Sequence, residues 1–549
     1  VITRMSAAGP YGKKEKPMAA NHLLNIDLAK VFETKAKKGF ITILAWGDEI
    51  EVVGEPASDH VQIKATKYTL QKDGSVKPEK VPGFIVPPKG IKPADVVIRK
   101  KDSEILKIDF VDVQQGDGSV IETPDGKIIL IDGGDTRMFA RYLANRFRGT
   151  SDAKPKEIDC ILVTHGDADH FLGLTEIHKS ETDPRLATQA WKRLFIHPNR
   201  VYHNGLVKRP GMFNGKRLKD VEQLGATKTV KDPDTGKNTT IITGLETDLL
   251  KFPRSEMNEP FQQWQDALTT YRKRGAIKFR RLQRGDDAFD FLAEENISIQ
   301  VLGPMPTKIG AVEGLRFLGN PPKGPRVGQE ALQTDSKAFT GQSASHTING
   351  HSVIFRLNYG SFNFLFTGDL NDEAGQVLAR AHNTGEINLQ SEVFKVPHHG
   401  SADFSGAFIQ AVAPVISIVS SGDENARKEF IHPRATLMGS LGKYGRVEEP
   451  LVFVTELVAF FETIGSVTPE RHKLKNGQVV LKDGTAVLNT KARKPFFAFN
   501  RAAFGIVMVR TDGKRLLVYT NSGQAKLKEA YGYEMDQFGK PRPTQVRQA

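Results

Sequence analysis

The fold is decided by one stretch of the sequence, Ile161-Leu162-Val163-Thr164-His165-Gly166-Asp167-Ala168-Asp169-His170. A short apolar run ends here in four residues that can bind a metal ion, His165, Asp167, Asp169 and His170. A buried strand that opens into a loop explains this pattern, and an amphipathic helix does not. Side chains one or two positions apart in such a loop can converge on two neighbouring points. We therefore expect His165 and Asp167 to hold one cation, and Asp169 and His170 to hold a second.

This spacing suggests a particular chemistry. Two cations about 3.5–4 Å apart can polarise a phosphoryl oxygen and supply a metal-activated hydroxide. The alternative is a solvated acidic loop with two incidental histidines. We favour the metal site because apolar residues stand on both sides of the charges, the strand in front and Phe171-Leu172-Gly173-Leu174 behind. Ionisable groups clustered between buried segments often mark functional sites.

The same stretch resembles the signature of the metallo-β-lactamase superfamily, His-x-His-x-Asp-His. It has the His-x-Asp-x-Asp-His variant found in the hydrolase domain of ComEC-type competence proteins. Four further stretches fit that variant in the expected order, and with the first they span residues 105–440, most of the chain. They are Phe110-Val111-Asp112-Val113-Gln114-Gln115-Gly116-Asp117, Leu130-Ile131-Asp132-Gly133-Gly134, Phe366-Thr367-Gly368-Asp369, and Val396-Pro397-His398-His399-Gly400-Ser401 followed by His432-Pro433.

The resemblance implies an α+β fold, the αββα sandwich of the superfamily, with two divalent metal ions as cofactors. Zn and Mn both suit a ligand set of histidines and carboxylates without cysteine. The ligands that we expect are His165, Asp167, Asp169, His170, Asp369 and His398, with Asp369 bridging the two ions. The residues expected to orient them are Asp117, Asp132 and Ser352. The residues that we assign to catalysis are Asp169, His399 and His432, the last at the rim of the site.

Several of these assignments leave an alternative open. The sequence does not establish which of His398 and His399 binds the metal and which donates a proton or hydrogen bond. ComEC-type proteins commonly carry Asn before the serine that matches Ser352, and here His351 occupies that position. Either His351 or His346 could complete the first metal site, or neither. The plainer reading of Asp117 and Asp132 is turn chemistry, and that of His432 is an ordinary loop histidine.

Composition limits the remaining choices. The chain has 549 residues, 39% hydrophobic and 26% charged, as is ordinary for a globular protein of more than one domain. We expect no membrane association, because no signal peptide opens the chain and no run of about 18 apolar residues appears. The single cysteine, Cys160, lies in an apolar run, which fits a reducing cytoplasm. A net charge of +13 favours a polyanionic partner.

The chain divides by pattern into several parts. Residues 1–20 read as a disordered lead, and residues 21–95 read as short strands that resemble an SH3-like β-barrel module. Such a module would dock a protein partner. The hydrolase domain is expected over 104–445, with a long basic insertion over 197–345. The C-terminal extension, 446–549, contains a β-hairpin over 504–520 that could brace the sandwich, and we expect disorder from Gln537 onward.

The insertion is rich in basic and aromatic residues. Cations hold phosphate backbones and aromatic rings stack on unpaired bases, so the insertion could form a lid or groove that faces a nucleic acid. The alternative is a solvated amphipathic helix whose Trp264, Leu268 and Tyr271 pack inward. The residues that we assign to nucleic-acid binding are Arg272, Lys273, Arg274, Lys278, Arg280 and Arg281.

Three functions compete. The first is a metal-dependent phosphodiesterase, a nuclease acting on DNA or RNA in defence or DNA processing, and the basic charge favours it. The second is a hydrolase of a small or cell-wall phosphoester, similar to phosphorylcholine esterases, and the third is a non-catalytic binding scaffold. The membrane channel of ComEC proteins is missing from the chain, so only the hydrolase chemistry is carried over.

Overall fold

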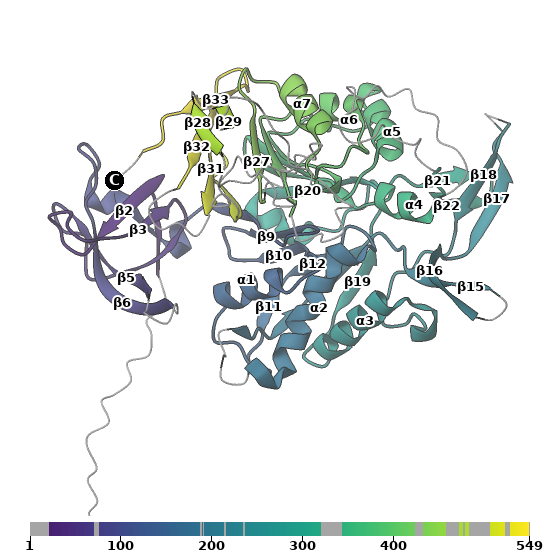
Figure 1. Cartoon of the computed structure of the whole chain (residues 1–549), viewed down its shortest axis with the longest axis horizontal. Coiled ribbons are helices and arrows are strands. Elements are labelled where there is room, and N and C mark those ends of the chain that lie inside the picture. The colour runs from purple at the N-terminus through teal and green to yellow at the C-terminus, as the bar shows by residue number, and fades with distance from the viewer. Residues whose placement is uncertain are drawn as a thin grey trace, which may run out of the picture. The chain divides into compact units, whose positions relative to one another are not determined.

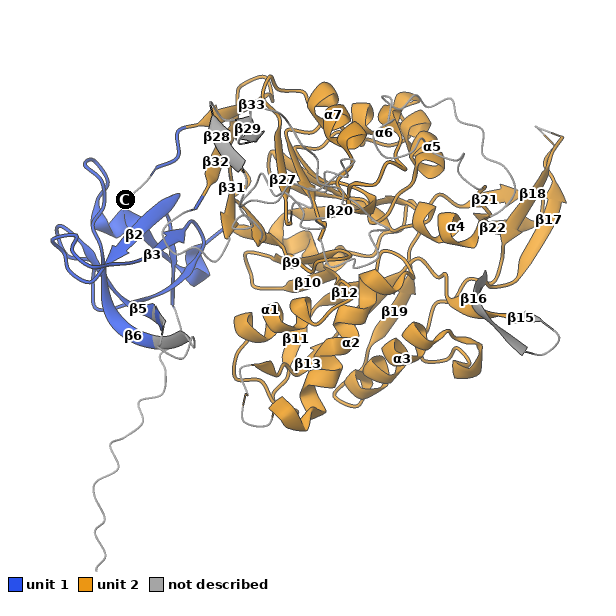
Figure 2. Cartoon of the chain, viewed as in Figure 1, with its two compact units in different colours: residues 1–104, 525–528, 545–549 blue, residues 105–524, 529–544 orange. Residues whose placement is uncertain are grey.

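The computed structural model describes most of the chain. The residues it describes are 21–70, 76–186, 189, 192–213, 216–233, 236–319, 343–422, 432–456, 472–475, 478–481, 505–521 and 528–547. The chain forms two compact units, one of residues 1–104, 525–528 and 545–549, the other of residues 105–524 and 529–544 (Figure 2). The expected disordered lead, 1–20, lies outside the described residues.

The first unit is a seven-stranded sheet with the order β3-β2-β6-β5-β4-β1-β7. Its strands are β1 (His22–Leu24), β2 (Leu28–Phe32), β3 (Phe40–Ala45), β4 (Glu49–Val52), β5 (Val61–Leu70), β6 (Val76–Ile85) and β7 (Val97–Arg99). Along β3, partly exposed and buried residues alternate, because successive side chains of a strand point to opposite faces. The residues expected to form a small β module are thus strands, and the likeness to SH3-like modules stays a prediction.

The end of the chain returns to this first unit. The backbone N–H of Arg547 donates to Asp27 Oδ2 at 2.7 Å, and that of Leu28 donates to the Arg547 carbonyl at 3.0 Å. The strand β33 (Pro541–Thr544) comes just before. The expectation of disorder from Gln537 onward is therefore wrong, because these residues gain backbone partners that lie far away in the sequence.

The second unit contains two large sheets. The first sheet has ten strands with the order β19-β14-β12-β10-β9-β8-β30-β31-β32-β33. Its other strands are β8 (Leu106–Phe110), β9 (Gly118–Glu122), β10 (Ile128–Asp132), β12 (Cys160–Leu162), β14 (Arg200–His203), β19 (Lys278–Arg281), β30 (Ile506–Thr511), β31 (Arg515–Asn521) and β32 (Ala530–Met535). The predicted C-terminal hairpin is confirmed as β30 and β31, and β30 extends the sheet beside β8.

The second sheet has six strands with the order β20-β23-β24-β25-β26-β27. They are β20 (Ile297–Gly303), β23 (Ile354–Tyr359), β24 (Phe362–Phe366), β25 (Val393–Lys395), β26 (Ile416–Val419) and β27 (Leu451–Val454). The last four strands, β24 to β27, run parallel to one another. All residues of β25 and β26 are buried, as expected for parallel strands covered on both faces.

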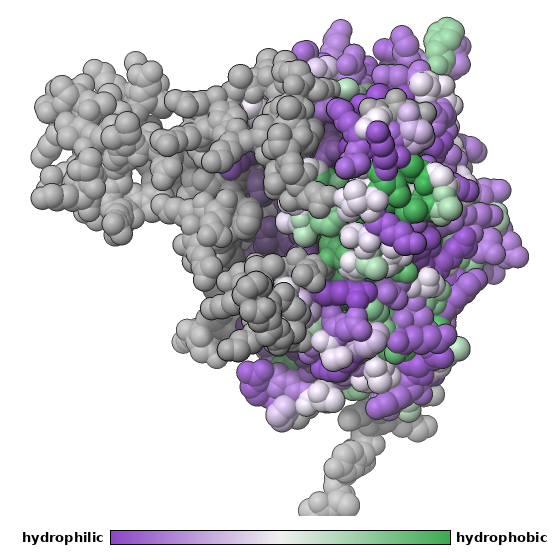
Figure 3. Space-filling view, turned by 90° about the vertical axis from the view of Figure 1, so that its right-hand side faces the viewer, coloured by the Kyte–Doolittle hydropathy of each residue, from purple (hydrophilic) through white to green (hydrophobic). Residues whose placement is uncertain are grey.

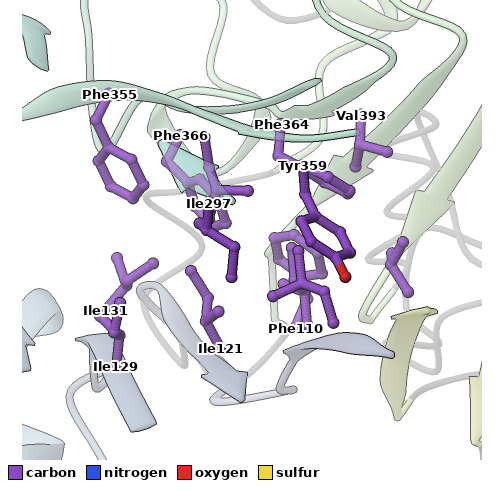
Figure 4. Packing of buried hydrophobic residues seen from close by; sticks show 14 of the residues in the cluster. Phe110, Ile121, Ile129, Ile131, Ile297, Phe355, Tyr359, Phe364, Phe366 and Val393 are labelled. Atoms are coloured by element: carbon purple, nitrogen blue, oxygen red, sulfur yellow. The ribbon is translucent and has the colours of Figure 1, made fainter. Parts of the chain in front are cut away.

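The two sheets and two sets of helices make four layers (Figure 1). Apolar side chains of both sheets, such as Phe110, Ile131, Phe355 and Phe366, meet in one buried core (Figure 4). The outer face of the first sheet packs against α1 (Met138–Arg146), α2 (Ala168–Thr182) and α3 (Glu259–Arg272). The outer face of the second packs against α5 (Asp372–Asn383), α6 (Gly406–Val412) and α7 (Ala435–Tyr444). The expected αββα sandwich is therefore present.

The expected insertion over 197–345 is not one separate element. Strands β14 and β19 belong to the first sheet, β20 belongs to the second, and α3 belongs to a helix layer. The sequence hid this because β19 is a basic strand, Lys278-Phe279-Arg280-Arg281, at the sheet edge, where charged residues are common. The chain has further, smaller elements. They are β11 (Lys156–Ile158), β13 (Ile196–Pro198), β15 (Lys208–Phe213), β16 (Lys216–Leu224), β17 (Thr227–Lys231), β18 (Asn238–Ile242), β21 (Thr307–Ile309), β22 (Val312–Arg316), α4 (Ala344–Gly350), β28 (His472–Lys475) and β29 (Gln478–Leu481).

The surface is mainly polar on the face drawn in Figure 3, with a smaller hydrophobic area near its middle. Within the described part of the chain, no helix is both long enough and apolar enough to cross a membrane.

Candidate metal centre

The centre lies where strands of both sheets end. In the first sheet β10 and β12 are parallel neighbours, and in the second sheet β24 and β25 are. Asp132 ends β10, and Asp369 follows β24. The loop 163–167 follows β12, and the histidine pair at 398 and 399 follows β25. Because the carboxyl ends of parallel neighbours meet at one edge of a sheet, four segments far apart in the sequence deliver their polar side chains to one place.

Four of the expected site residues form one compact group, which we call the four-residue cluster: Asp169, His170, Asp369 and His399. Their ligand atoms all lie within 4.8 Å of one another. His170 Nε2 is 3.2 Å from Asp369 Oδ1, and His399 Nε2 is 3.2 Å from Asp369 Oδ2. His399 Nε2 is also 3.5 Å from Asp169 Oδ2. Two imidazoles and two carboxylates thus surround one point, a donor set that suits Zn or Mn.

The histidine pair is arranged the other way round from our assignment. The side chain of His399 is only 2% exposed and belongs to the four-residue cluster, whereas that of His398 is 22% exposed, with its Nε2 3.9 Å from Asp369 Oδ2. Both residues have a left-handed backbone, with φ of +52° and +54°, which is uncommon outside glycine. This turn separates the two rings, and it cannot be read from the sequence. His399 therefore replaces His398 as the expected ligand, and His398 takes the more exposed position beside it.

His165 and Asp167 lie next to the cluster, and we call this pair the half-site. His165 Nε2 is 3.9 Å from Asp167 Oδ2 and also 3.9 Å from Asp369 Oδ2. Asp167 Oδ1 is 2.7 Å from the ammonium nitrogen of Lys208. Among the described residues, these two ligands do not join a compact group of three or more. The two side chains are thus neighbours, with a lysine beside them that the sequence did not place there, and their binding of a cation stays a prediction.

Asp132 holds the ring of His170 in a fixed orientation. Its Oδ2 accepts from His170 Nδ1 at 2.8 Å and from the Thr164 hydroxyl at 2.7 Å, and its Oδ1 accepts from the Thr164 backbone N–H at 2.8 Å. With the proton on Nδ1, the lone pair of His170 remains on Nε2, which faces the cluster. A carboxylate behind a ligating histidine commonly plays this part. The structure thus fits the orienting role that the resemblance implies.

Asp117 stands behind His399 at a longer distance, and a buried lysine supports it. Asp117 Oδ1 is 3.2 Å from His399 Nδ1, and Asp117 Oδ2 is 2.7 Å from Lys395 Nζ. Lys395 also donates to the Val396 carbonyl at 2.9 Å. Our sequence analysis missed Lys395. The available signal was a lysine within the apolar strand Val393-Phe394-Lys395-Val396, where a charge needs a buried partner.

The remaining expected residues separate clearly. The Ser352 hydroxyl accepts from the Asp369 backbone N–H at 3.0 Å and so orients the loop that carries this ligand. His351 Nε2 is 2.7 Å from the Arg316 carbonyl, and His346 Nδ1 is 3.2 Å from Asp403 Oδ2. The ring of His432 lies 6.4 Å from that of His398. His351 therefore points to a backbone oxygen and does not complete the first metal site, while His432 lies beside the more exposed histidine.

The electrostatics of the cluster are those of a cation site. Burial disfavours a positive charge on His170 and on His399. The nearby negative charges together outweigh burial, since Asp369 acts on both rings and is helped by Asp132 at His170 and by Asp117 at His399. The pKa of each ring is therefore raised well above its usual value. Burial likewise opposes charge on Asp369, yet His399 and His170 hold the pKa of this carboxyl well below its usual value. The buried carboxylates thus require positive charge between them. A divalent cation bound there would supply it and would compete with protons for the histidine nitrogens.

Unpartnered atoms at the cluster support the fit of a metal ion. His165 Nε2, His170 Nε2, His399 Nε2 and Asp369 Oδ1 are buried, and none has a hydrogen-bond partner within the described structure. Buried polar atoms without partners are rare in folded proteins and often mark a missing ion or water. Here the cluster atoms all belong to residue types that bind Zn or Mn. The donor set therefore fits a divalent cation.

The basic residues assigned to nucleic-acid binding fall into two groups. Arg272, Lys273 and Lys278 are exposed. The other three have partners within the protein. The Arg274 side chain is 7% exposed and pairs with Glu181 at 2.6 Å, and Arg280 lies 3.8 Å from Asp286. The aliphatic part of the Arg281 side chain packs against Gly205. The inward packing of Trp264, Leu268 and Tyr271 on α3 is confirmed, because all three are buried in the core.

Comparisons with known proteins agree with this centre. Residues 111–252 match the model of the Metallo-beta-lactamase superfamily. The chain is 35% identical over 98 residues to Competence protein ComA of Neisseria gonorrhoeae, covering 18% of this chain and 13% of that protein. It is 30% identical over 97 residues to ComE operon protein 3 of Bacillus subtilis (strain 168), covering 18% of this chain and 12% of that protein. The chain thus matches about an eighth of the length of these curated relatives.

Among solved structures, a metal-dependent hydrolase of the beta-lactamase superfamily aligns with 64% of this chain and 95% of its own, at 10% identity and a TM-score of 0.29. The family match covers β9, β10, β12, the loop 163–167, and α2, whose first turn carries Asp169 and His170. Residues 111–252 therefore belong to a metallo-β-lactamase superfamily domain, and the chain resembles ComEC-type competence proteins.

Proposed function

We propose that the protein is a metal-dependent phosphodiesterase whose substrate is a nucleic acid. The observation that carries the proposal is the four-residue cluster, in which two carboxylates and two imidazoles converge on one point. The Nε2 atoms of both imidazoles have no hydrogen-bond partner among the described residues. We further propose that a second divalent cation binds at His165 and Asp167, with Asp369 between the two positions. Zn and Mn are the candidate metals.

Each group near the cluster has a role in this proposal. A divalent cation at such a site polarises a phosphoryl oxygen and activates water at neutral pH. Asp132 keeps the proton of His170 on Nδ1, and the carboxylate of Asp117 near His399 Nδ1 favours the same tautomer there, so that both Nε2 atoms remain available as ligands. His398 is the exposed member of its pair, and we assign to it the proton or hydrogen bond given to the leaving oxygen. His432 lies beside His398, and its pKa is lowered to about 3 by burial and by His399, so it stays neutral.

The case for a nucleic acid rests on charge and on the relatives. The net charge is +13, and Arg272, Lys273 and Lys278 are exposed near the end of α3 and on β19. Phosphate backbones are held by such cations. Both curated relatives, ComA and ComE operon protein 3, resemble this chain over about a hundred residues. A role in defence or DNA processing is compatible with this substrate and belongs to the same proposal.

The test of the chemistry is a hydrolysis assay on the purified chain. Labelled single- and double-stranded DNA and RNA are incubated with Mn, Zn, Mg or a chelator. We expect hydrolysis that requires a metal ion and disappears in Asp169→Ala. The matched control is Asp266→Ala, which removes a carboxylate whose side chain is 53% exposed on α3. Equal rates for wild type, Asp169→Ala and chelated protein would overturn the proposal.

A second assay separates the nucleic acid from a small phosphoester. Replacing Arg272, Lys273 and Lys278 together by Ala should weaken polynucleotide binding, and each lost phosphate contact should lower the salt slope by about 0.7–0.9. Hydrolysis of bis-p-nitrophenyl phosphate should persist, because this small diester needs only the metal centre. If polynucleotide binding and its salt dependence stay unchanged, the hydrolase of a small phosphoester becomes the better proposal.

A further inference from the structure

The side chain of Lys208 enters the metal centre, and no motif of the sequence accounts for it. We propose that Lys208 is a built-in cation that holds the half-site of His165 and Asp167, so that a second divalent cation binds there only by displacing it. The inference rests on the proposed function in one respect, that the four-residue cluster binds a first cation. It goes further by assigning to a residue of this chain the control over the second.

Lys208 is firmly placed at the start of β15. Its carbonyl accepts from the backbone N–H of Asn258 at 3.0 Å, and Asn258 is the N-cap residue of α3. The next residue, Arg209, makes ion pairs with Glu256 and with Glu246. Successive side chains of a strand point to opposite sides. The side chain of Arg209 points toward these two carboxylates, so the side chain of Lys208 points to the other side of the strand. The backbone thus fixes where the ammonium can reach.

The ammonium of Lys208 pairs with one oxygen of Asp167. The distance from Lys208 Nζ to Asp167 Oδ1 is 2.7 Å, and the two side chains are only 13% and 20% exposed. The other oxygen, Oδ2, lies within reach of Asn349. With its amide nitrogen turned toward Asp167, Asn349 donates to Oδ2 at 3.1 Å. Lys208 and Asn349 therefore lie beside the two oxygens of Asp167, and the positive charge next to this carboxylate comes from Lys208.

This pairing sets the order in which cations bind. An ammonium and a divalent cation that share one carboxylate repel each other strongly in a partly buried site, where solvent screens the charges little. The first cation therefore enters the four-residue cluster, and the second must displace Lys208. Lysine has a flexible stem and a compact charge, so it can leave the carboxylate without a change of the backbone. A substrate phosphate, as an anion, would offer the ammonium another partner.

The experiment counts metal ions and needs no substrate. The metal-free full chain is titrated with Mn²⁺ by calorimetry, and the bound metal is confirmed by elemental analysis. We expect one tight ion in the wild type and a weaker second. In Lys208→Met the second ion should bind at least about tenfold tighter, since a positive charge a few ångströms away has been removed. Lys208→Arg keeps the charge and should behave as the wild type.

Two further variants make the result specific. Lys228→Met is the matched control, because Lys228 is an exposed lysine on β17, and it should titrate as the wild type. Adding Asp167→Asn to Lys208→Met should weaken the second ion again, which shows where that ion binds. If thermal unfolding shows that Lys208→Met does not fold, Lys208→Gln is used in its place in the metal titration.

The outcomes distinguish the two proposals. A second ion that binds equally in wild type, Lys208→Met and Lys208→Gln overturns the inference and leaves the proposed function standing. Absence of any tight ion in all variants overturns both.

Discussion

At the scale of single residues, the histidine pair tests the ligand set. His399→Ala removes one of the four residues of the cluster. Loss of a residue that only hydrogen-bonds a metal ligand already lowers metal affinity by about tenfold or more, so the loss of His399 should lower the affinity for the first cation by at least that much. His398→Ala should keep the cation, and its rate on a phosphodiester should fall by about 10²–10⁴, the usual contribution of a general acid. Equilibrium dialysis and rate measurements check both. The reverse pattern would restore His398 as the ligand.

His203 provides a test at the same scale through pH. Its Nδ1 accepts from the Gly205 N–H at 3.0 Å and its Nε2 lies 3.1 Å from the Thr247 carbonyl, so the neutral ring satisfies both contacts. Burial lowers the pKa of His203 from 6.5 to about 4. The folded pKa lies below the unfolded one, so the stabilisation is present above pH 6.5 and is lost as the pH falls toward 4. The loss is at most about 3 kcal/mol.

The measurement for His203 is urea unfolding at pH 7 and at pH 4.5. The free energy of unfolding should fall between these values in the wild type and fall less in His203→Gln, which cannot take up the proton. Burial also lowers the pKa of His165 and His351 to about 4, so these residues contribute to the fall in both proteins. The contribution of His203 is therefore the difference between the fall in the wild type and the fall in His203→Gln. An equal fall in both would show that His203 does not contribute.

At the scale of elements, the end of α3 separates structural from exposed basic residues. Arg274 follows the helix and pairs with Glu181, and the two side chains are 7% and 2% exposed. Arg274→Ala leaves the carboxylate of Glu181 buried without this partner, which typically costs about 3–5 kcal/mol. Arg272→Ala, two residues earlier and exposed, should change stability by less than about 0.5 kcal/mol. Denaturant unfolding measures both, and similar stabilities would contradict the structural role of Arg274.

The elements also show which parts of the site the sequence could predict. The strand that ends before His165 and the strand that ends at Asp132 were predictable, because an apolar run followed by polar residues is a local signal. The choice between His398 and His399 was not, because it depends on two left-handed residues in one turn. The contact of Lys208 with Asp167 joins two segments that no local pattern connects.

At the scale of the whole molecule, the five ordered motifs were enough to predict the αββα sandwich. The boundaries within it were harder. Strands β14 and β19 carry basic residues and were taken for part of an insertion, although they extend the first sheet. The end of the chain was taken as disordered, although Arg547 bonds to Asp27 in the first unit. Both errors concern pairings between distant segments, which periodicity along the sequence does not reveal.

The central claim is that the four-residue cluster holds the cation on which hydrolysis depends. The most direct measurement is the metal content of wild type and Asp369→Asn, by elemental analysis, together with hydrolysis of bis-p-nitrophenyl phosphate by the same samples. Asp369 lies within 3.2 Å of both His170 and His399, so its replacement should remove the tight cation and the hydrolysis together, while unfolding remains cooperative. Undiminished metal content and hydrolysis in Asp369→Asn would contradict the account.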